Sequence, residues 1–198
     1  MNRTRATAVL ASVLLASGLA SAQTITDPVV EGPAQYLSPS RISPTGKAPG
    51  MKVQLLIDQN GHKEYAVVFY KGDEAFSGLV EFANKYNVTS AHFTAIGAID
   101  AATIAWFNPA RKMYKAMTFT GQMEVASMIG DIALYNGKPA IHTHAVIGFP
   151  DGTTRGGHVI EMHVRPTLEV MVTVDPIGMQ KRFDPETDLT LIDPATHP

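Results

Sequence analysis

Four of the seven histidines fall between His142 and His163. His142 and His144 are two residues apart on a predicted strand, so both imidazoles should project from the same face of that strand. If the chain turns at Pro150-Asp151-Gly152, cross-strand partners have numbers that sum to about 302, and His158 lies opposite His144. The spacing therefore predicts three imidazoles that converge on one point.

Three histidines in this arrangement can hold a divalent, zinc-like metal ion and leave one coordination position for water, as catalytic zinc sites do. Because the sequence contains no cysteine, any metal site must use His, Asp, Glu or backbone oxygens. The alternative is a polar strand face whose histidines bond only to backbone and water. The prediction depends on register, since a shift of one residue would turn His158 to the opposite face.

Other titratable residues are candidates for the surroundings of the site. His163 and Glu161 alternate oppositely to His158, so they are expected to point away from the cluster, with Glu161 making a supporting or intersubunit contact. A β-bulge near the glycines that precede His158 would change this count. Asp131 and Glu124 lie on other predicted strands and could support the site from there.

Motifs for several other chemistries are absent from the sequence. It has no glycine-rich phosphate loop, no Gly-x-Ser-x-Gly elbow and no His-Glu-x-x-His motif. A metal-bound water could hydrolyse or hydrate a small molecule, but no general base stands at a recognisable spacing. Metal binding with unassigned activity is therefore the preferred hypothesis, and a metal-dependent hydrolase or hydratase of a small molecule is the alternative.

The elements that must position these residues are mostly strands. Two β-rich runs, 51–57 and 63–70, flank the hairpin signal Asp58-Gln59-Asn60-Gly61. Apolar residues at helical spacing predict one helix over 73–86 with Asp73 as its N-cap. Short connections between later strands require antiparallel pairing. We therefore expect an α+β single domain with a mostly antiparallel sheet, or partial barrel, flanked by one main helix. The later predicted strands are 90–96, 101–107, 113–119, 122–129, 131–135, 140–147, 157–164 and 167–174.

The two ends of the chain differ from this domain. Residues 1–22 combine a basic start, an uncharged run and small residues before Gln23, a pattern typical of a signal peptide. The uncharged run is too short for a membrane anchor. Residues 23–50 hold five of the 13 prolines and predict an extended leader. The predicted domain covers 51–192, irregular from Gln180, and 193–198 form a tail.

Length and composition predict a globular domain, and the signal-peptide pattern predicts that it is exported, periplasmic or secreted, without a transmembrane segment in its mature form. The 198 residues are 45% hydrophobic and 17% charged, which excludes coiled coils and disordered tails. The formal net charge is −2, and removing Arg3 and Arg5 with the signal peptide leaves 14 basic against 18 acidic residues, or −4. Nucleic acid is therefore an unexpected partner.

Six segments along the domain occur in a distinctive order: Lys71-Gly72-Asp73-Glu74, Phe93-Thr94-Ala95-Ile96-Gly97-Ala98, Trp106-Phe107-Asn108-Pro109, 119–130, Ile141-His142-Thr143-His144 and Gly156-Gly157-His158-Val159-Ile160-Glu161. In this order they resemble the plants-and-prokaryotes conserved (PPC) domain family over about residues 52–192.

The resemblance implies a homotrimer with a mostly antiparallel sheet and a metal bound through the His-x-His pair and the Gly-Gly-His histidine, here His142, His144 and His158. A small-molecule ligand is then possible. Plant members of the family bind DNA through an added AT-hook. This sequence has no Arg-Gly-Arg-Pro hook, so DNA binding is the least favoured hypothesis.

Overall fold

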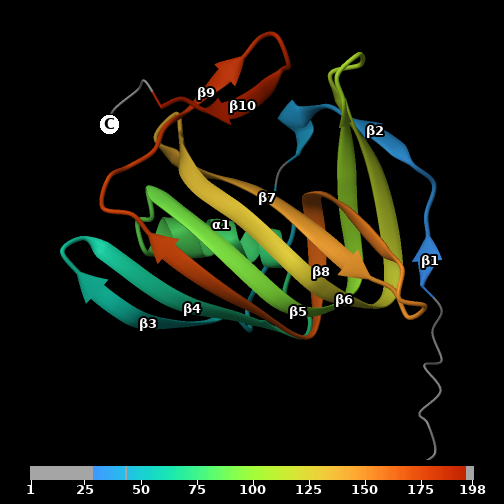
Figure 1. Cartoon of the computed structure of the whole chain (residues 1–198), viewed down its shortest axis with the longest axis horizontal. Coiled ribbons are helices and arrows are strands. Elements are labelled where there is room, and N and C mark those ends of the chain that lie inside the picture. The colour runs from blue at the N-terminus through green and yellow to red at the C-terminus, as the bar shows by residue number, and fades with distance from the viewer. Residues whose placement is uncertain (1–28, 43, 195–198) are drawn as a thin grey trace, which may run out of the picture.

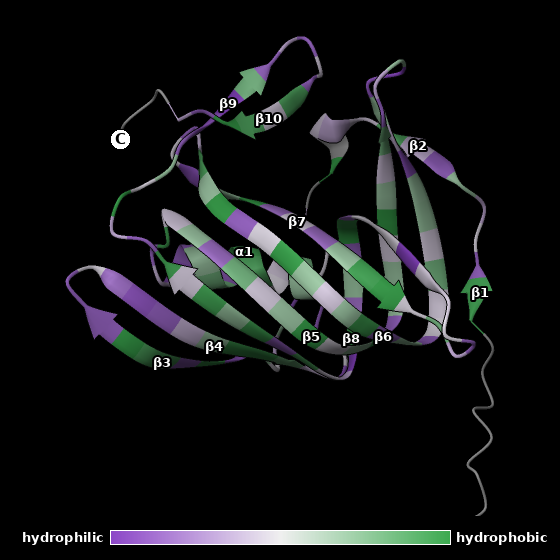
Figure 2. Ribbon diagram, in the orientation of Figure 1, coloured by the Kyte–Doolittle hydropathy of each residue, from purple (hydrophilic) through white to green (hydrophobic). Residues whose placement is uncertain are grey.

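The computed structural model, which describes residues 29–42 and 44–194, consists mostly of antiparallel strands (Figure 1). Hydrophobic and hydrophilic residues alternate along much of the sheet (Figure 2), so many strands bury one side and leave the other open. The predicted α+β class is confirmed, with one α-helix in the described part of the chain. The predicted signal peptide, 1–22, lies outside the described residues. The elements are β1 (Val30–Glu31), β2 (Gln35–Leu37), the 3-10 helix η1 (Pro39–Arg41), β3 (Lys52–Gln59), β4 (His62–Tyr70), α1 (Ala75–Lys85), β5 (Ser90–Asn108), β6 (Met113–Tyr135), β7 (Lys138–Gly148), β8 (Thr154–Val174), β9 (Lys181–Asp184) and β10 (Leu189–Ile192).

Four strands close into a ring within the larger sheet. β5 pairs with both β6 and β8, and β7 also pairs with both β6 and β8. β4 and β3 extend the sheet beyond β8, while β1 and β2 add short pairs to β6. Helix α1 lies against one side of the sheet (Figure 1). The prediction of a partly closed antiparallel sheet is therefore confirmed, and the two strands that carry the clustered histidines both belong to the ring.

The strands are longer than the sequence pattern predicts. The sequence predicts eight strands between residues 90 and 174, whereas the structure has four longer ones, β5 to β8. β6 alone has 23 residues. Within β5, the strand continues through the interval 97–100, where the sequence pattern predicts a break between two strands. At Gly97 the φ angle is +152°, and a Cβ atom would lie 2.3 Å from the carbonyl oxygen of Thr167. Register shifts occur beside Gly97 in both pairings of β5, so the glycine interrupts the alternation without ending the strand.

The N-cap of helix α1 is Glu74, so the prediction of Asp73 was wrong by one residue. The Glu74 carboxylate accepts hydrogen bonds from two N–H groups of the first helical turn and from the backbone N–H of Met162 on β8. Asp73 instead accepts from the backbone N–H groups of Gly50 and Tyr70. The two buried carboxylates therefore tie the start of the helix to the sheet and to the segment before β3.

Segments at both ends of the domain pack against the sheet. β1 and β2 come from the predicted leader and pair with β6. The chain from Lys181 to Ile192, expected to be irregular, forms the hairpin β9–β10. Asp184 closes its turn by accepting hydrogen bonds from the N–H and hydroxyl of Thr187. Four-residue strands are too short to show a periodic pattern, which explains the wrong prediction. Among the described residues, no helix has the length and apolarity needed to span a membrane.

Candidate metal centre

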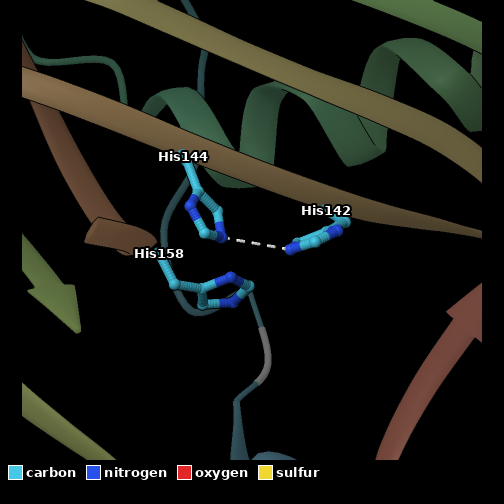
Figure 3. Close-up of side chains that lie close together, drawn as sticks. All are labelled: His142, His144 and His158. Carbon is cyan, nitrogen blue, oxygen red and sulfur yellow. Dashed lines mark hydrogen bonds between the residues drawn. The ribbon is translucent and has the colours of Figure 1, made fainter. Parts of the chain in front are cut away.

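Three histidines from two neighbouring strands converge in the structure (Figure 3). His142 and His144 come from β7 and His158 from β8, and the predicted pairing of residue 144 with residue 158 is confirmed. The Nε2 atoms of His142 and His144 are 3.2 Å apart. One ring nitrogen from each of the three residues lies within 4.8 Å of the others. The side chains therefore form the cluster that the sequence predicts.

The local sequence explains this register. The turn between β7 and β8 is closed by a hydrogen bond from the N–H of Gly152, at φ +81°, to the carbonyl of Phe149. Gly157 allows β8 to approach β5 closely, because a Cβ atom there would lie 2.5 Å from the carbonyl oxygen of Ala105. Alternation on β7 buries Thr143 and leaves its two neighbouring histidines on the open side.

The distance between His142 and His144 fits a small tetrahedral ion. Two nitrogens bound at 2.0–2.1 Å to one tetrahedral ion lie about 3.3–3.4 Å apart, close to the 3.2 Å between His142 and His144. Nδ1 of His158 is buried and has no hydrogen-bond partner among the described residues. A buried polar atom without a partner is costly, and a metal ligand set would account for this one. The residues present therefore fit a zinc-like ion.

Two of the three imidazoles are held in the neutral form that binds metals. Burial lowers the pKa of His158 from 6.5 to about 3, helped by the positive charge of His142, His144 and Lys181. Burial also lowers the pKa of His144, with a contribution from His142. At neutral pH protons therefore do not compete with a metal ion for these two side chains.

A carboxylate orients the third imidazole. Oδ2 of Asp131, on β6, lies 3.5 Å from Nδ1 of His142, which leaves Nε2 of that ring facing His144. Oδ1 of Asp131 lies 2.7 Å from the ammonium of Lys181, whose side chain is only 2% exposed. Burial alone would raise the pKa of Asp131, but hydrogen bonds from His142 and Lys181 lower it below its ordinary value. This is the carboxylate–histidine arrangement that supports many metal sites.

Tyr114 and Lys181 are the two residues of the site that the sequence did not reveal. The ring of Tyr114, on β6, stacks on His158 with centroids 4.6 Å apart and planes inclined by 17°. Lys181 begins β9 and also donates a hydrogen bond to the carbonyl of Ala140. Neither residue stands near the histidines in the sequence, so only the long-range pairing of the strands brings them there.

The other candidates lie outside the cluster. Among the described residues, the His, Asp and Glu side chains close enough to share an ion are the three histidines alone. Glu161 contacts His163 at 2.9 Å, and Glu124 is exposed on β6. A β-bulge after Val159 changes the alternation on β8. Val159 and Met162 are buried on one face of the strand, and Glu161 and His163 project from the other face. Their position farther along the strand, and not the alternation, separates them from the cluster.

Comparison with protein families gives a match over residues 57–175 to the Plants and Prokaryotes Conserved (PCC) domain. No match is found among the curated proteins. Solved structures share the fold. A candidate DNA-binding protein from Bacteroides thetaiotaomicron is 26% identical, with a TM-score of 0.66 over 71% of this chain and 96% of that chain.

Two further structures are similar to this chain. A candidate DNA-binding protein from Ralstonia eutropha JMP134 is 29% identical, with a TM-score of 0.63, and covers 70% of this chain and 94% of its own. A protein from Archaeoglobus fulgidus described as metal-containing is 25% identical, with a TM-score of 0.62, and covers 71% of this chain and 97% of its own.

Proposed function

The chain belongs to the Plants and Prokaryotes Conserved domain family, and from this premise we propose that it binds one divalent metal ion, preferentially zinc, through His142, His144 and His158. The observation that carries the proposal is the convergence of three imidazoles from two paired strands, with the Nε2 atoms of His142 and His144 at 3.2 Å. The metal-containing relative from Archaeoglobus fulgidus supports it.

The ion would supply a Lewis-acidic centre with one position open to a ligand. The chain's own residues prepare that position in three ways. Asp131 fixes the orientation of His142, Lys181 fixes Asp131, and Tyr114 holds the ring plane of His158 by stacking. A site held in this way loses little conformational freedom when it binds the ion.

The test is metal content and affinity in protein purified without a histidine tag. We expect about one zinc ion per chain by elemental analysis, and a His158→Ala variant should lose more affinity than the 10- to 100-fold typical of changes around a ligand. The matched control is His163→Ala, on the same strand but paired with Glu161 outside the cluster. Protein that is metal-free and does not take up added zinc would exclude the proposal, as would equal losses in the two variants.

Ligand binding is a better proposal than hydrolysis. A hydrolase needs a general base beside the metal-bound water. Asp131 already contacts His142 and Lys181, and the structure does not bring Glu124 or Glu161 into the cluster. We therefore propose a metal-dependent binding protein and leave the hydrolase or hydratase as the alternative, which turnover of a small ester or amide by the zinc form would favour.

DNA binding, suggested by two of the similar structures, is not part of the proposal. The chain has 16 basic and 18 acidic residues, whereas a DNA-binding surface must neutralise several phosphates. We expect no shift of duplex DNA on a native gel at moderate salt. Salt-sensitive retardation would require DNA binding to be added to the function.

We further propose that the chain assembles, as a homotrimer, through the open side of its sheet. Thr94 on β5 pairs with Met171 on β8, and Ile96 follows two residues along β5. Met171 is 54% exposed and Ile96 63%, and neither lines the cavity beside the histidines. A contiguous apolar surface of this kind favours association. Light scattering should give three times the chain mass, and a monomer would exclude the assembly.

We also propose that the protein is exported, with residues 1–22 removed. The support is the sequence pattern of that segment. N-terminal sequencing of the protein from a periplasmic fraction should begin at Gln23. Protein recovered from the cytoplasm with its N-terminus intact would overturn this.

A further inference from the structure

An open hollow of about 660 Å³ is lined by the three histidines and otherwise mostly by apolar residues. Three aromatic side chains line it: Trp106, Phe107 and Tyr114. Trp106 is 57% exposed, which leaves much of its ring available to a ligand. We call this space the histidine hollow. Its remaining lining residues are Ala105, Ser127, Ile129, His142, His144, Ala145, Val146, Gly156, Gly157, His158 and Leu189.

None of these lining residues is Asp, Glu, Lys or Arg. Tyr114 is an ordinary neutral phenol and adds no charge at neutral pH. The carboxylate of Asp131, which contacts His142, is balanced by Lys181 at 2.7 Å. A divalent ion held by the histidines would therefore bring two positive charges that no side chain of the hollow offsets. An anionic group on a ligand would supply the missing negative charge.

The walls also indicate what kind of anion fits. Tight binding of phosphate ordinarily uses Arg or Lys side chains or the N-terminus of a helix, and the hollow is lined by none of these. A sugar or other polyol needs many hydrogen-bonding groups, whereas Ser127 is the one hydroxyl of a serine or threonine in the lining. A singly charged head on an apolar, flat body matches both the metal end and the aromatic wall.

We propose that the histidine hollow binds a small apolar monocarboxylate, with its carboxylate at the metal end and its apolar body against Trp106 and Phe107. This inference rests on the proposed metal site and names the class of ligand for it. The carboxylate would bind the metal and the apolar body would contact the aromatic wall. Tight binding would need both, so neither part of the ligand would bind tightly alone.

The chain contains one tryptophan, and Trp106 therefore reports directly on the hollow. We would titrate zinc-loaded protein with benzoate and follow its tryptophan fluorescence, with acetate, benzamide and inorganic phosphate as comparisons. Benzoate should bind saturably and at least about tenfold more tightly than each of the others, since one well-buried apolar group or one charge contact is worth about that much. Chelation of zinc should weaken benzoate binding by a similar factor.

A pair of matched variants tests the location. Val146 lines the hollow and is 40% exposed, while Val30 on β1 is 58% exposed and lines none of the cavities found beside the histidines. Val146→Asp should weaken benzoate binding at least about fivefold by placing a negative charge at the anion site. Val30→Asp should leave it unchanged. Both variants should keep the circular dichroism spectrum of the wild type.

The outcomes separate this inference from the proposed function. If the protein takes up no zinc, the metal proposal fails, and the ligand proposal fails with it. If zinc binds at about one ion per chain but benzoate binds no better than acetate or benzamide, the metal site stands and the carboxylate inference is overturned. Preference for phosphate, or equal effects of Val146→Asp and Val30→Asp, would overturn it as well.

Discussion

Lys181→Met is the substitution that tests most directly how the site is held together. The ammonium of Lys181 lies 2.7 Å from Oδ1 of Asp131, and the lysine side chain is 2% exposed. Methionine keeps most of the apolar stem but leaves the carboxylate without its counter-charge. Breaking a fully buried ion pair costs about 3–5 kcal/mol. Because the Asp131 side chain remains 22% exposed and can regain some water, we expect the free energy of unfolding to fall by about 2–4 kcal/mol.

The assay is urea unfolding of metal-free protein, followed by circular dichroism in the presence of a chelator. Lys112→Met is the matched control. Lys112 also forms an ion pair, with Asp188 at 3.9 Å, but its side chain is 41% exposed, and such surface pairs contribute at most about 1 kcal/mol. The expected result is a clearly larger loss for Lys181→Met at an unchanged dependence on denaturant.

The double variant Asp131→Asn/Lys181→Met completes the test. If the cost comes from a stranded carboxylate, removing that charge should restore part of the stability lost by Lys181→Met alone. The reasoning is refuted if Lys181→Met costs no more than Lys112→Met, or if the double variant is as unstable as the sum of the single ones. Either result would mean that Lys181 contributes only by packing.

Three further predictions follow from the same contacts. Asp131→Asn should weaken zinc binding by about 10- to 100-fold in competition with a chelator, and unchanged affinity would show that the carboxylate does not orient its histidine. In metal-free protein the pKa of His158 is about 3 when folded and 6.5 when unfolded. Between these two pH values only the unfolded chain binds the proton, so the free energy of unfolding should fall as the pH drops from 6.5 to 3, by up to about 5 kcal/mol. Unfolding curves at several pH values should show less of this slope in His158→Gln, and an equal slope would contradict the assignment. Gly97→Ala should lower the free energy of unfolding in urea by at least about 2 kcal/mol, because the new Cβ would meet the backbone of Thr167. Gly137→Ala, at φ +74° with open space around it, should lower it by about 1 kcal/mol. Equal losses in the two variants would contradict the close approach at Gly97.

The cluster of histidines could be predicted because it depends on local rules. A tight turn fixes which residues of β7 and β8 face each other, and alternation then fixes their side. The pairing of residues 144 and 158 needed only the position of the turn at residues 149–153. The strand lengths could not be predicted in the same way. Gly97 looks like the end of a strand in the sequence, although in the structure it is a bend within one.

The supporting contacts depend on long-range packing, which local patterns do not contain. Lys181 reaches Asp131 only because the segment after β8 returns along β6, where Leu134 pairs with Gln180. Tyr114 reaches His158 because β5 pairs with β6 on one side and with β8 on the other. Neither contact has a spacing that could be counted from the sequence. The burial of Lys181 would have marked it as part of the site, but burial is known only from the folded structure.

The ring of β5, β6, β7 and β8 explains why the same site can be both well ordered and open. His144 and His158 pair with neighbouring strands on both sides, and His142 pairs with Asp131 on β6, so the sheet fixes the Cα positions of all three. Buried apolar residues beside the histidines on the same strands, such as Ala145 and Val159, belong to the hydrophobic core and hold these strands in place. An ion bound by the three histidines would therefore not be needed to hold the strands together, unlike the metal of a zinc finger. Because the fold does not depend on the ion, one coordination position can stay free and face the histidine hollow. An external ligand needs such a free position to bind.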